Sequence, residues 1–335
     1  MKTKKIVRAL LAILLCSAIL LLLDLNNRKA SSAKELTRIA IFKMASRETL
    51  DKTERGVLDA LAQRGYAESK TCIINRFSAE GDMPTANTIA STVVNGRYDI
   101  VITISTPALQ IMANANKKGK VTHVFCAVTD PMASGVGITG PAGHQHPKHL
   151  VGIGTFQPVE AAFDIAVKMK PDLKKVGTVW CTSETCSEAC VKKARKKCQE
   201  LGIELVEMSV DSPTQILETA MSLTAKGIQA LWLGGDNVVE LGVEQLYAAA
   251  EKANIPFFAN NPIYARGIGL FGVGAEYYEV GKTAANMAAD ILKGKPTSDF
   301  RVENVVPEKV LVNPSALKLL KETWDISGFK DQFVK

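Results

Sequence analysis

Short apolar strands alternate with helix-length amphipathic segments along almost the whole chain, and this alternation constrains the fold more than any other feature. Segment 38–44 (RIAIFKM) is an apolar strand pattern, and segment 50–66 (LDKTERGVLDALAQRGY) has apolar residues at helical spacing and a late glycine. The same pair of patterns recurs to give about ten predicted strands. Regular alternation of this kind produces parallel sheets with helices on both faces.

The alternation falls into two runs, and the second begins after a fifth predicted strand at 150–156. A late helix and a late strand remain to complete both halves, which indicates several crossings between them. The sequence therefore predicts an α/β protein with two doubly wound parallel-sheet lobes joined by a multi-strand hinge. The predicted boundaries are 36–154 plus 275–309 for lobe 1 and 155–274 plus 310–335 for lobe 2.

The amino-terminal 33 residues differ from the rest. Four basic residues among the first eight precede an apolar run over 9–23, and small residues follow at 30–33 (ASSA). This pattern is typical of a secretory signal, and the run is short for a membrane span. We expect a signal over 1–33 and a periplasmic or extracytoplasmic protein, with an uncleaved anchor over 6–25 as the alternative. Lipidation at Cys16 is disfavoured because Leu15 precedes it where a small residue is needed.

Charge excludes one class of partner. Residues 1–33 hold six of the 41 basic side chains, so the remaining 302 residues hold 35 basic and 33 acidic side chains, a formal net charge of +2. The apparent basicity belongs to the export signal, and nothing in the body predicts nucleic-acid binding.

The predicted strand ends are rich in hydroxyl, amide and carboxylate side chains and poor in basic ones. Ligands of open parallel sheets bind beyond the carboxyl ends of the strands, so two facing lobes would form a cleft there. Helix starts suit a carboxylate and acidic side chains suit an amine, which favours a zwitterion. The same residue types also cap helices that bind nothing. The candidate ligand-binding residues are Ser46, Arg47, Ser105, Thr106, Thr129, Asp130, Thr155, Thr182, Ser183, Glu184, Asp236, Asn237 and Asn260.

Several segments, in this order, resemble the extracytoplasmic solute-binding proteins of ABC transporters that handle tryptophan, tyrosine and related solutes. They are 50–66, 99–110 (DIVITISTPALQ), 125–136 (FCAVTDPMASGV), 233–239 (LGGDNVV) and 272–300. The resemblance implies type I periplasmic-binding-protein-like lobes that close on the solute. It implies contacts from Thr106, Thr129, Asp130, Ser183, Glu184, Asp236 and Asn237. Two positions depart from the family pattern, since Cys181 and Cys186 stand where asparagine is usual.

The resemblance also implies a function. We expect a monomeric solute-binding protein, not an enzyme and without a cofactor, that passes an amino acid or related zwitterion to an ABC permease. The alternative is an anchored sensor component that signals to a membrane receptor. An exported enzyme or a metal carrier that uses the cysteines is a third reading.

Four of the seven cysteines lie between 178 and 198. They lack the CxxC spacing of zinc and thioredoxin-like sites. Structural thiols, a disulfide between Cys181 and Cys186, and contact with ligand or metal all stay open. A helix start would lower the pKa of Cys186 and make it reactive.

Two further motifs are given little weight. The GxGxxG match at 135–140 is not followed by a helix, as a dinucleotide site requires. The histidines at 144, 146 and 149 are interpreted as part of a solvated loop, with zinc or copper binding as the alternative.

Overall fold

The structure is a computed structural model that describes residues 15–21, 36–140, 143, 145–267 and 269–334. The chain divides into two units, Met1–Thr37 and Arg38–Lys335. Residues 15–21 of the first unit are helical. Most of the predicted signal, and His144 of the histidine loop, lie outside the described residues. In the part of the chain that is described, no helix meets the length and hydropathy that a membrane crossing requires.

The first sheet is built almost entirely from the amino-terminal half of the second unit. Its strand order is β2-β1-β3-β4-β5-β11. The strands are β1 (Thr37–Lys43), β2 (Cys72–Ser78), β3 (Ile100–Ile104), β4 (Thr122–Val128), β5 (Leu150–Gly154) and β11 (Glu303–Asn304). The pairs from β1 to β11 are parallel. β3 and β5 are buried along their whole length, which explains their continuous apolar sequence.

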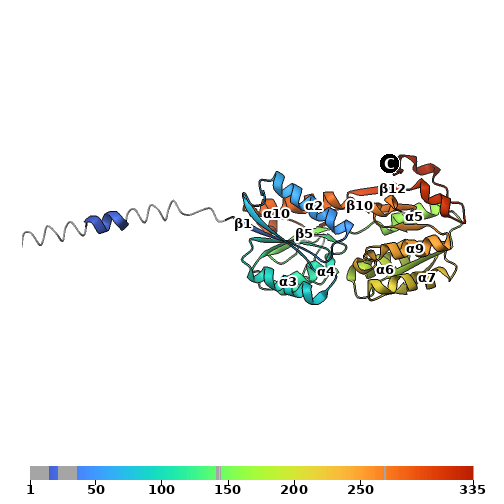
Figure 1. Cartoon of the computed structure of the whole chain (residues 1–335), viewed down its shortest axis with the longest axis horizontal. Coiled ribbons are helices and arrows are strands. Elements are labelled where there is room, and N and C mark those ends of the chain that lie inside the picture. Colours follow the sequence, from blue (N-terminus) through green and yellow to red (C-terminus); the bar gives the residue numbers. More distant parts are fainter. Residues whose placement is uncertain (1–14, 22–35, 141–142, 144, 268, 335) are drawn as a thin grey trace, which may run out of the picture. The chain divides into compact units, whose positions relative to one another are not determined.

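Helices cover both faces of this sheet (Figure 1). They are α2 (Glu48–Gln63), α3 (Met83–Asn95), α4 (Thr106–Ala115) and α10 (Tyr277–Leu292). α2 and α10 pack together on one face and α3 and α4 on the other. The contact between α2 and α10 is very close. A methyl group at Gly281 would lie 2.0 Å from the carbonyl oxygen of Thr53, and one at Gly56 would lie 2.0 Å from that of Tyr278.

The second sheet repeats the strand order of the first, as β7-β6-β8-β9-β10-β12. Its strands are β6 (Lys175–Trp180), β7 (Glu204–Ser209), β8 (Ala230–Leu233), β9 (Phe257–Ala259), β10 (Phe271–Ala275) and β12 (Glu308–Val312). All the pairs from β7 to β10 are parallel, and β12 runs antiparallel to β10.

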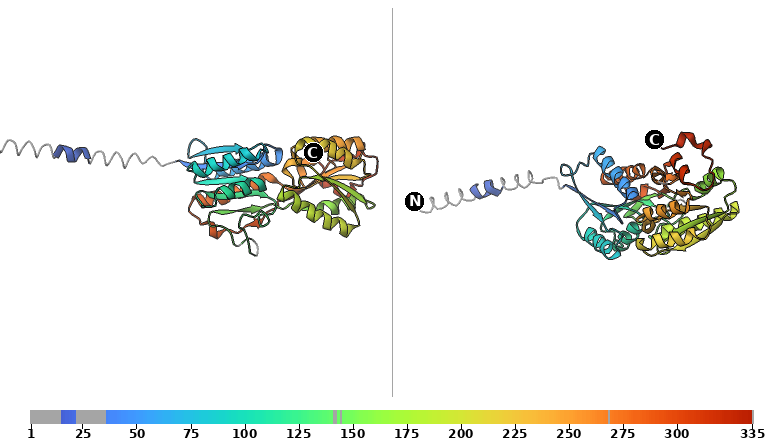
Figure 2. Two further views of the ribbon diagram at one scale, coloured as in Figure 1. Left: turned by 90° about the horizontal axis from the view of Figure 1, so that it is seen from below. Right: turned by 45° about the vertical axis from the view of Figure 1, so that its right-hand side comes forward.

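Helices cover the second sheet in the same way (Figure 2). They are α5 (Val159–Met169), α6 (Thr185–Leu201), α7 (Ile216–Thr224), α8 (Asn237–Glu240) and α9 (Val243–Ala253). α5 and α6 share one hydrophobic core, and α7 and α9 share another. The prediction of two doubly wound parallel-sheet lobes is therefore confirmed.

The chain passes between the sheets three times: after β5, after β10 and between β11 and β12. We propose lobe boundaries at these crossings. β12 begins at Glu308 within the second sheet, two residues before the boundary at 310 that the sequence predicted. All three crossings leave from or arrive at the carboxyl ends of strands, so the loops that carry the candidate residues lie beside them.

Candidate ligand-binding cleft

Loops at the strand ends of both lobes enclose a small cavity of about 20 Å³. A volume of this size has room for about one water-sized group. Its lining from lobe 1 is Arg47, Thr49, Leu50, Thr106, Ala127 and Thr129. Its lining from the crossings and lobe 2 is Gln157, Cys186, Gly235, Asp236, Asn237, Glu240 and Tyr277. Polar side chains from facing lobes therefore meet with almost no free space between them.

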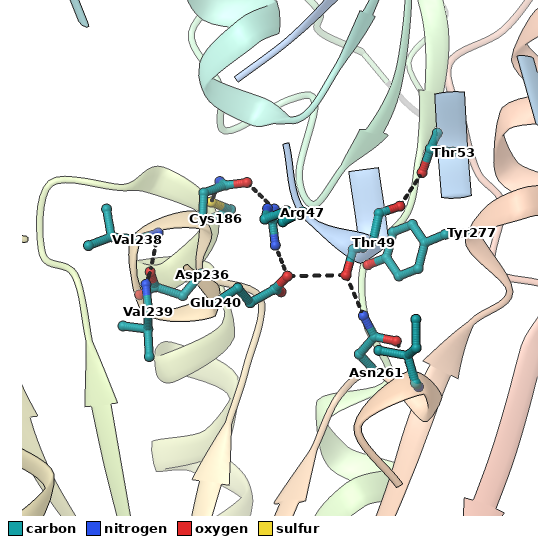
Figure 3. Close-up of polar contacts among 12 residues, drawn as sticks. Arg47, Thr49, Thr53, Cys186, Asp236, Val238, Val239, Glu240, Asn261 and Tyr277 are labelled. Carbon is teal, nitrogen blue, oxygen red and sulfur yellow. Dashed lines mark hydrogen bonds and ion pairs between the residues drawn. The ribbon is translucent and has the colours of Figure 1, made fainter. Parts of the chain in front are cut away.

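Arg47 makes the main charged contact between the lobes (Figure 3). It is the residue before α2, so the carboxyl end of β1 carries it to the cleft. Its Nη1 forms an ion pair with the carboxylate of Glu240, and its Nη2 donates to Oδ1 of Asn237. The two charged side chains are 11% and 5% exposed. A pair so far removed from water is screened much less than a surface pair.

Two hydroxyl-centred contacts join the lobes beside this ion pair. Thr49 Oγ1 donates to Glu240 Oε2 at 3.2 Å and accepts from Asn261 Nδ2 at 2.8 Å (Figure 3). At the other side of the cleft, Gln110 Nε2 donates to Thr185 Oγ1 at 3.2 Å. The lobes are therefore in direct polar contact, which is a closed arrangement.

Two buried carboxylates organise the lobe 2 side. Asp236 caps α8, where its Oδ1 accepts from the backbone N–H groups of Val238 and Val239 at 3.0 and 2.8 Å. Its Oδ2 accepts from the N–H of Cys181 and the hydroxyl of Ser187. These four hydrogen bonds connect the loop after β8 to α8, to the end of β6 and to α6.

Glu184 is the second buried carboxylate. Its Oε2 accepts from the backbone N–H of Asn237 at 2.7 Å and from the Asn237 amide at 3.0 Å. Burial raises the pKa of Glu184 to about 7, and the negative charge of Asp236 adds to the effect. Burial also raises the pKa of Asp236. The cleft therefore holds more carboxylate than its single guanidinium balances.

Gln157 forms a third polar group where the chain crosses from lobe 1. Its Nε2 donates to the hydroxyl of Tyr277 at 3.0 Å, and its Oε1 accepts from Thr129 Oγ1 at 3.3 Å and Cys190 Sγ at 3.4 Å. Burial raises the pKa of Tyr277 to about 12, so its hydroxyl stays neutral. This network offers neutral donors and acceptors beside the charged groups.

A larger cavity of about 490 Å³ adjoins the small one and shares Asn237 with it. Apolar side chains from both lobes contribute most of its lining, and its charged residues are acidic. The apolar members are Met44, Ala45, Met83, Pro107, Ile111, Pro213, Val238 and Leu241, and the acidic members are Glu80, Glu184 and Asp211. The larger and more apolar of the two spaces is therefore this cavity.

The structure brings five of the sequence-predicted residues to the small cavity. They are Arg47, Thr106, Thr129, Asp236 and Asn237. Glu184 lies beside them and, together with Ser183, lines the larger cavity. Ser46 is exposed and hydrogen-bonds Glu80 at the edge of that cavity.

The other five predicted residues lie outside both cavities. Ser105 caps α4, Asp130 caps its own turn, and Thr182 is exposed. Thr155 is buried, and its hydroxyl has no partner among the described residues. Asn260 accepts from the indole N–H of Trp232 at 2.8 Å. Only Ser105 and Asp130 therefore make the contacts of an ordinary cap or turn.

Sequence reasoning missed several lining residues of the small cavity, among them Thr49, Gln157, Glu240 and Tyr277. It also missed Asn261, which donates to Thr49 beside that cavity. A signal existed for Glu240, because it follows Asn237 by three positions and therefore lies on the same side of a helix. No comparable pattern in the sequence predicts that Asn261 and Tyr277 lie at the cleft, because their positions there depend on how the lobes face each other.

The cysteines, all seven of which the structure describes, are free thiols. The alternative of a Cys181–Cys186 disulfide is therefore not observed. Cys181 Sγ lies 3.1 Å from Ser183 Oγ, and Cys186 Sγ donates to Glu184 at 3.4 Å. The expectation of a lowered pKa for Cys186 is wrong: burial raises its pKa well above the usual value, and Glu184 and Asp236 raise it further. In the described part of the chain, no group of three or more His, Cys, Asp and Glu residues is placed to hold a metal ion.

Comparison with known proteins adds to this geometry. A family model described as ABC transporter substrate binding protein matches residues 38–325. The chain is 27% identical over 297 residues to the tyrosine-binding protein of Clostridioides difficile, which covers 88% of this chain and 84% of that protein.

Solved structures share the fold. One is an ABC domain from Streptococcus pneumonia in complex with L-Trp, 22% identical with a TM-score of 0.82, covering 90% of this chain and all of that one. Another is a ligand-free, open substrate-binding protein with adhesive properties from Clostridium difficile, 26% identical with a TM-score of 0.65, covering 90% and 99%. The predicted type I periplasmic-binding-protein-like fold is confirmed.

Proposed function

Because the chain belongs to the ABC transporter substrate-binding protein family, we propose that the solute it binds is an amino acid or a closely related zwitterion, held between the two lobes. Members of this family bind the solute of an ABC transporter and are not enzymes. The family resemblance noted in the sequence is thereby confirmed. The identity of the solute is the step that we propose.

The proposal rests on one observation: positively and negatively charged side chains lie together in one buried cleft. Lobe 1 contributes the guanidinium of Arg47, and lobe 2 contributes the carboxylates of Glu184, Asp236 and Glu240. A buried charge is stable only when it is paired. A solute that carries an ammonium group and a carboxylate would meet a partner of opposite charge on each lobe.

The relatives support an amino acid over a sugar or a metal ion. One is named a tyrosine-binding protein, and one structure contains L-Trp. The large adjoining cavity, with its apolar lining, would accept a side chain of that size. We propose further that the loaded protein delivers its solute to an ABC permease outside the cytoplasmic membrane, where the family typically acts.

The test is a binding survey of the purified protein with each of the twenty proteinogenic L-amino acids, followed by calorimetry and thermal unfolding. Glucose and ribose serve as controls. We expect one amino acid or a small set to bind and to raise the unfolding temperature, since a ligand that binds only the folded state stabilises it. If no amino acid binds, the proposal is contradicted.

A further inference from the structure

Arg47 stands alone as a basic side chain in the lining of the small cavity, as far as the described residues go. It faces Asp236 and Glu240 across the cleft, with Glu184 behind Asn237. Its guanidinium therefore occupies the position in lobe 2 that a solute cation would take. The positive charge of Arg47, a lobe 1 residue, therefore balances part of the negative charge of the lobe 2 carboxylates.

The guanidinium of Arg47 is incompletely satisfied in this position. Nη2 donates to Asn237, and Nη1 forms the ion pair with Glu240. Among the described residues, neither Nη1 nor Nε has a hydrogen-bond partner, although both atoms are buried. Buried donors without partners are rare because they lose their hydrogen bonds to water. A carboxylate bound side-on to guanidinium accepts from Nε and an Nη together. Within the described ranges, Nε of Arg47 is therefore a free donor, and a second carboxylate could accept its hydrogen bond.

The contacts of Arg47 are also contacts between lobes, because Arg47 precedes α2 and its partners lie on α8. Thr49 and Asn261 reinforce them on one side. The small cavity between these groups, about 20 Å³, has room for about one water-sized group. A solute group can therefore insert between Arg47 and Glu240 only if these two side chains separate.

We propose that the Arg47–Glu240 ion pair is a contact that closes the lobes, and that a zwitterion binds by inserting into this pair. The carboxylate of the solute takes Arg47, and its ammonium group takes the place that Arg47 leaves at Asn237 and Glu240. The number of charge pairs then rises from one to two, and Nε of Arg47 gains an acceptor. This inference rests on the proposed function, because it requires a solute with both charges.

The first test measures which charges of the solute matter. The probes are L-tyrosine, tyramine, which lacks the carboxylate, and 3-(4-hydroxyphenyl)propionic acid, which lacks the amine. L-Tryptophan, tryptamine and indole-3-propionic acid form a second set. We expect the unaltered protein to bind the amino acid at least about tenfold more tightly than either analogue, since each charged hydrogen bond contributes at least that factor.

Two variants then separate the roles. Arg47→Gln should reduce the preference for L-tyrosine over tyramine by about tenfold or more, and Glu240→Gln should do the same for the preference over the propionic acid. Arg64→Gln is the matched control, because Arg64 pairs with Asp290 wholly within lobe 1. It should leave both preferences unchanged.

The second test needs no solute. Small-angle scattering of the solute-free protein should give a larger radius of gyration for Arg47→Gln than for the unaltered protein and the Arg64→Gln control. Equal radii overturn the role of the pair in closure. Unchanged preferences in both variants, or analogues that bind as tightly as the amino acid, overturn the insertion. A protein that binds no amino acid at all contradicts the proposed function itself, which distinguishes the two failures.

Discussion

Glu184 is one of three buried carboxyl groups in the cleft, together with Asp236 and Glu240. Its pKa is raised to about 7, mainly by burial, whereas a glutamate in an unfolded chain has a pKa of about 4.3. The folded protein therefore binds this proton more tightly than the unfolded chain does. Its contribution to stability is fully present below about pH 4.3 and is lost as the pH rises through about 7.

Glu184→Gln is expected to remove that loss. Between pH 5 and pH 8 the free energy of unfolding should fall further in the unaltered protein than in Glu184→Gln, by on the order of 1–3 kcal/mol. Denaturant titrations at several pH values measure this difference. Glu200→Gln, at an exposed site near the end of the same helix, serves as the control and should follow the unaltered protein. Parallel curves for Glu184→Gln and the unaltered protein would contradict the expectation.

At the residue scale, sequence alone predicted part of the cleft. Arg47, Asp236 and Asn237 were found because each lies within four residues after a strand, and strand ends in parallel sheets meet at one edge. Thr155 and Asn260 follow strands too, yet both are buried outside the cavities. Glu240 was missed because a helix, not a strand end, brings it into the cleft.

At the element scale, the contact between α2 and α10 depends on two glycines. Alanine stabilises a helix interior by up to about 1 kcal/mol relative to glycine. At Gly281, however, the added methyl group would lie 2.0 Å from the Thr53 carbonyl oxygen, so the helices would have to separate. Overpacking costs typically about 1–3 kcal/mol and occasionally more, and here it opposes the helix preference.

We therefore expect Gly281→Ala to lower the free energy of unfolding by about 2 kcal/mol, measured by urea titration. Gly328→Ala is the control, because no atom lies within 4 Å of the added methyl group. A Gly281→Ala protein as stable as the control would show that the two helices adjust without cost.

Most elements were predictable because their patterns are long and strongly periodic. β3 and β5 are fully buried strands, and their apolar runs stand out between polar helix surfaces. β11 has only two residues, both exposed, so no periodicity exists to detect it. β11 is a strand only because it pairs with β5. The sequence around β11 does not reveal that pairing, because β5 lies about 150 residues earlier in the chain.

At the scale of the whole molecule, the contact between the lobes has a kinetic consequence. If only the open form admits a solute, its apparent association rate depends on the open fraction. Thr49→Val removes the lobe 1 hydroxyl that contacts Glu240 and Asn261 of lobe 2. Two net hydrogen bonds of about 1 kcal/mol each hold that contact, so the open fraction should rise by roughly tenfold or more.

Stopped-flow measurement with the amino acid found in the binding survey should therefore give faster association for Thr49→Val. The control is Thr88→Val, since Thr88 Oγ1 bonds only the Pro84 carbonyl of its own helix. An unchanged association rate would show that opening does not limit entry.

The interleaved strand order also decides when each lobe becomes complete. Lobe 1 needs α10 and β11, and lobe 2 needs β12, although all three lie in the last fifth of the chain. A polypeptide that emerges amino end first therefore carries two unfinished sheets until residue 304 has appeared, and the second sheet stays unfinished until residue 312. The side of α2 that packs on α10 stays uncovered until α10 arrives. For the same reason, a single proteolytic cut near residue 295 would separate an edge strand of each sheet from the rest of the chain, so one cut reaches both halves of the protein.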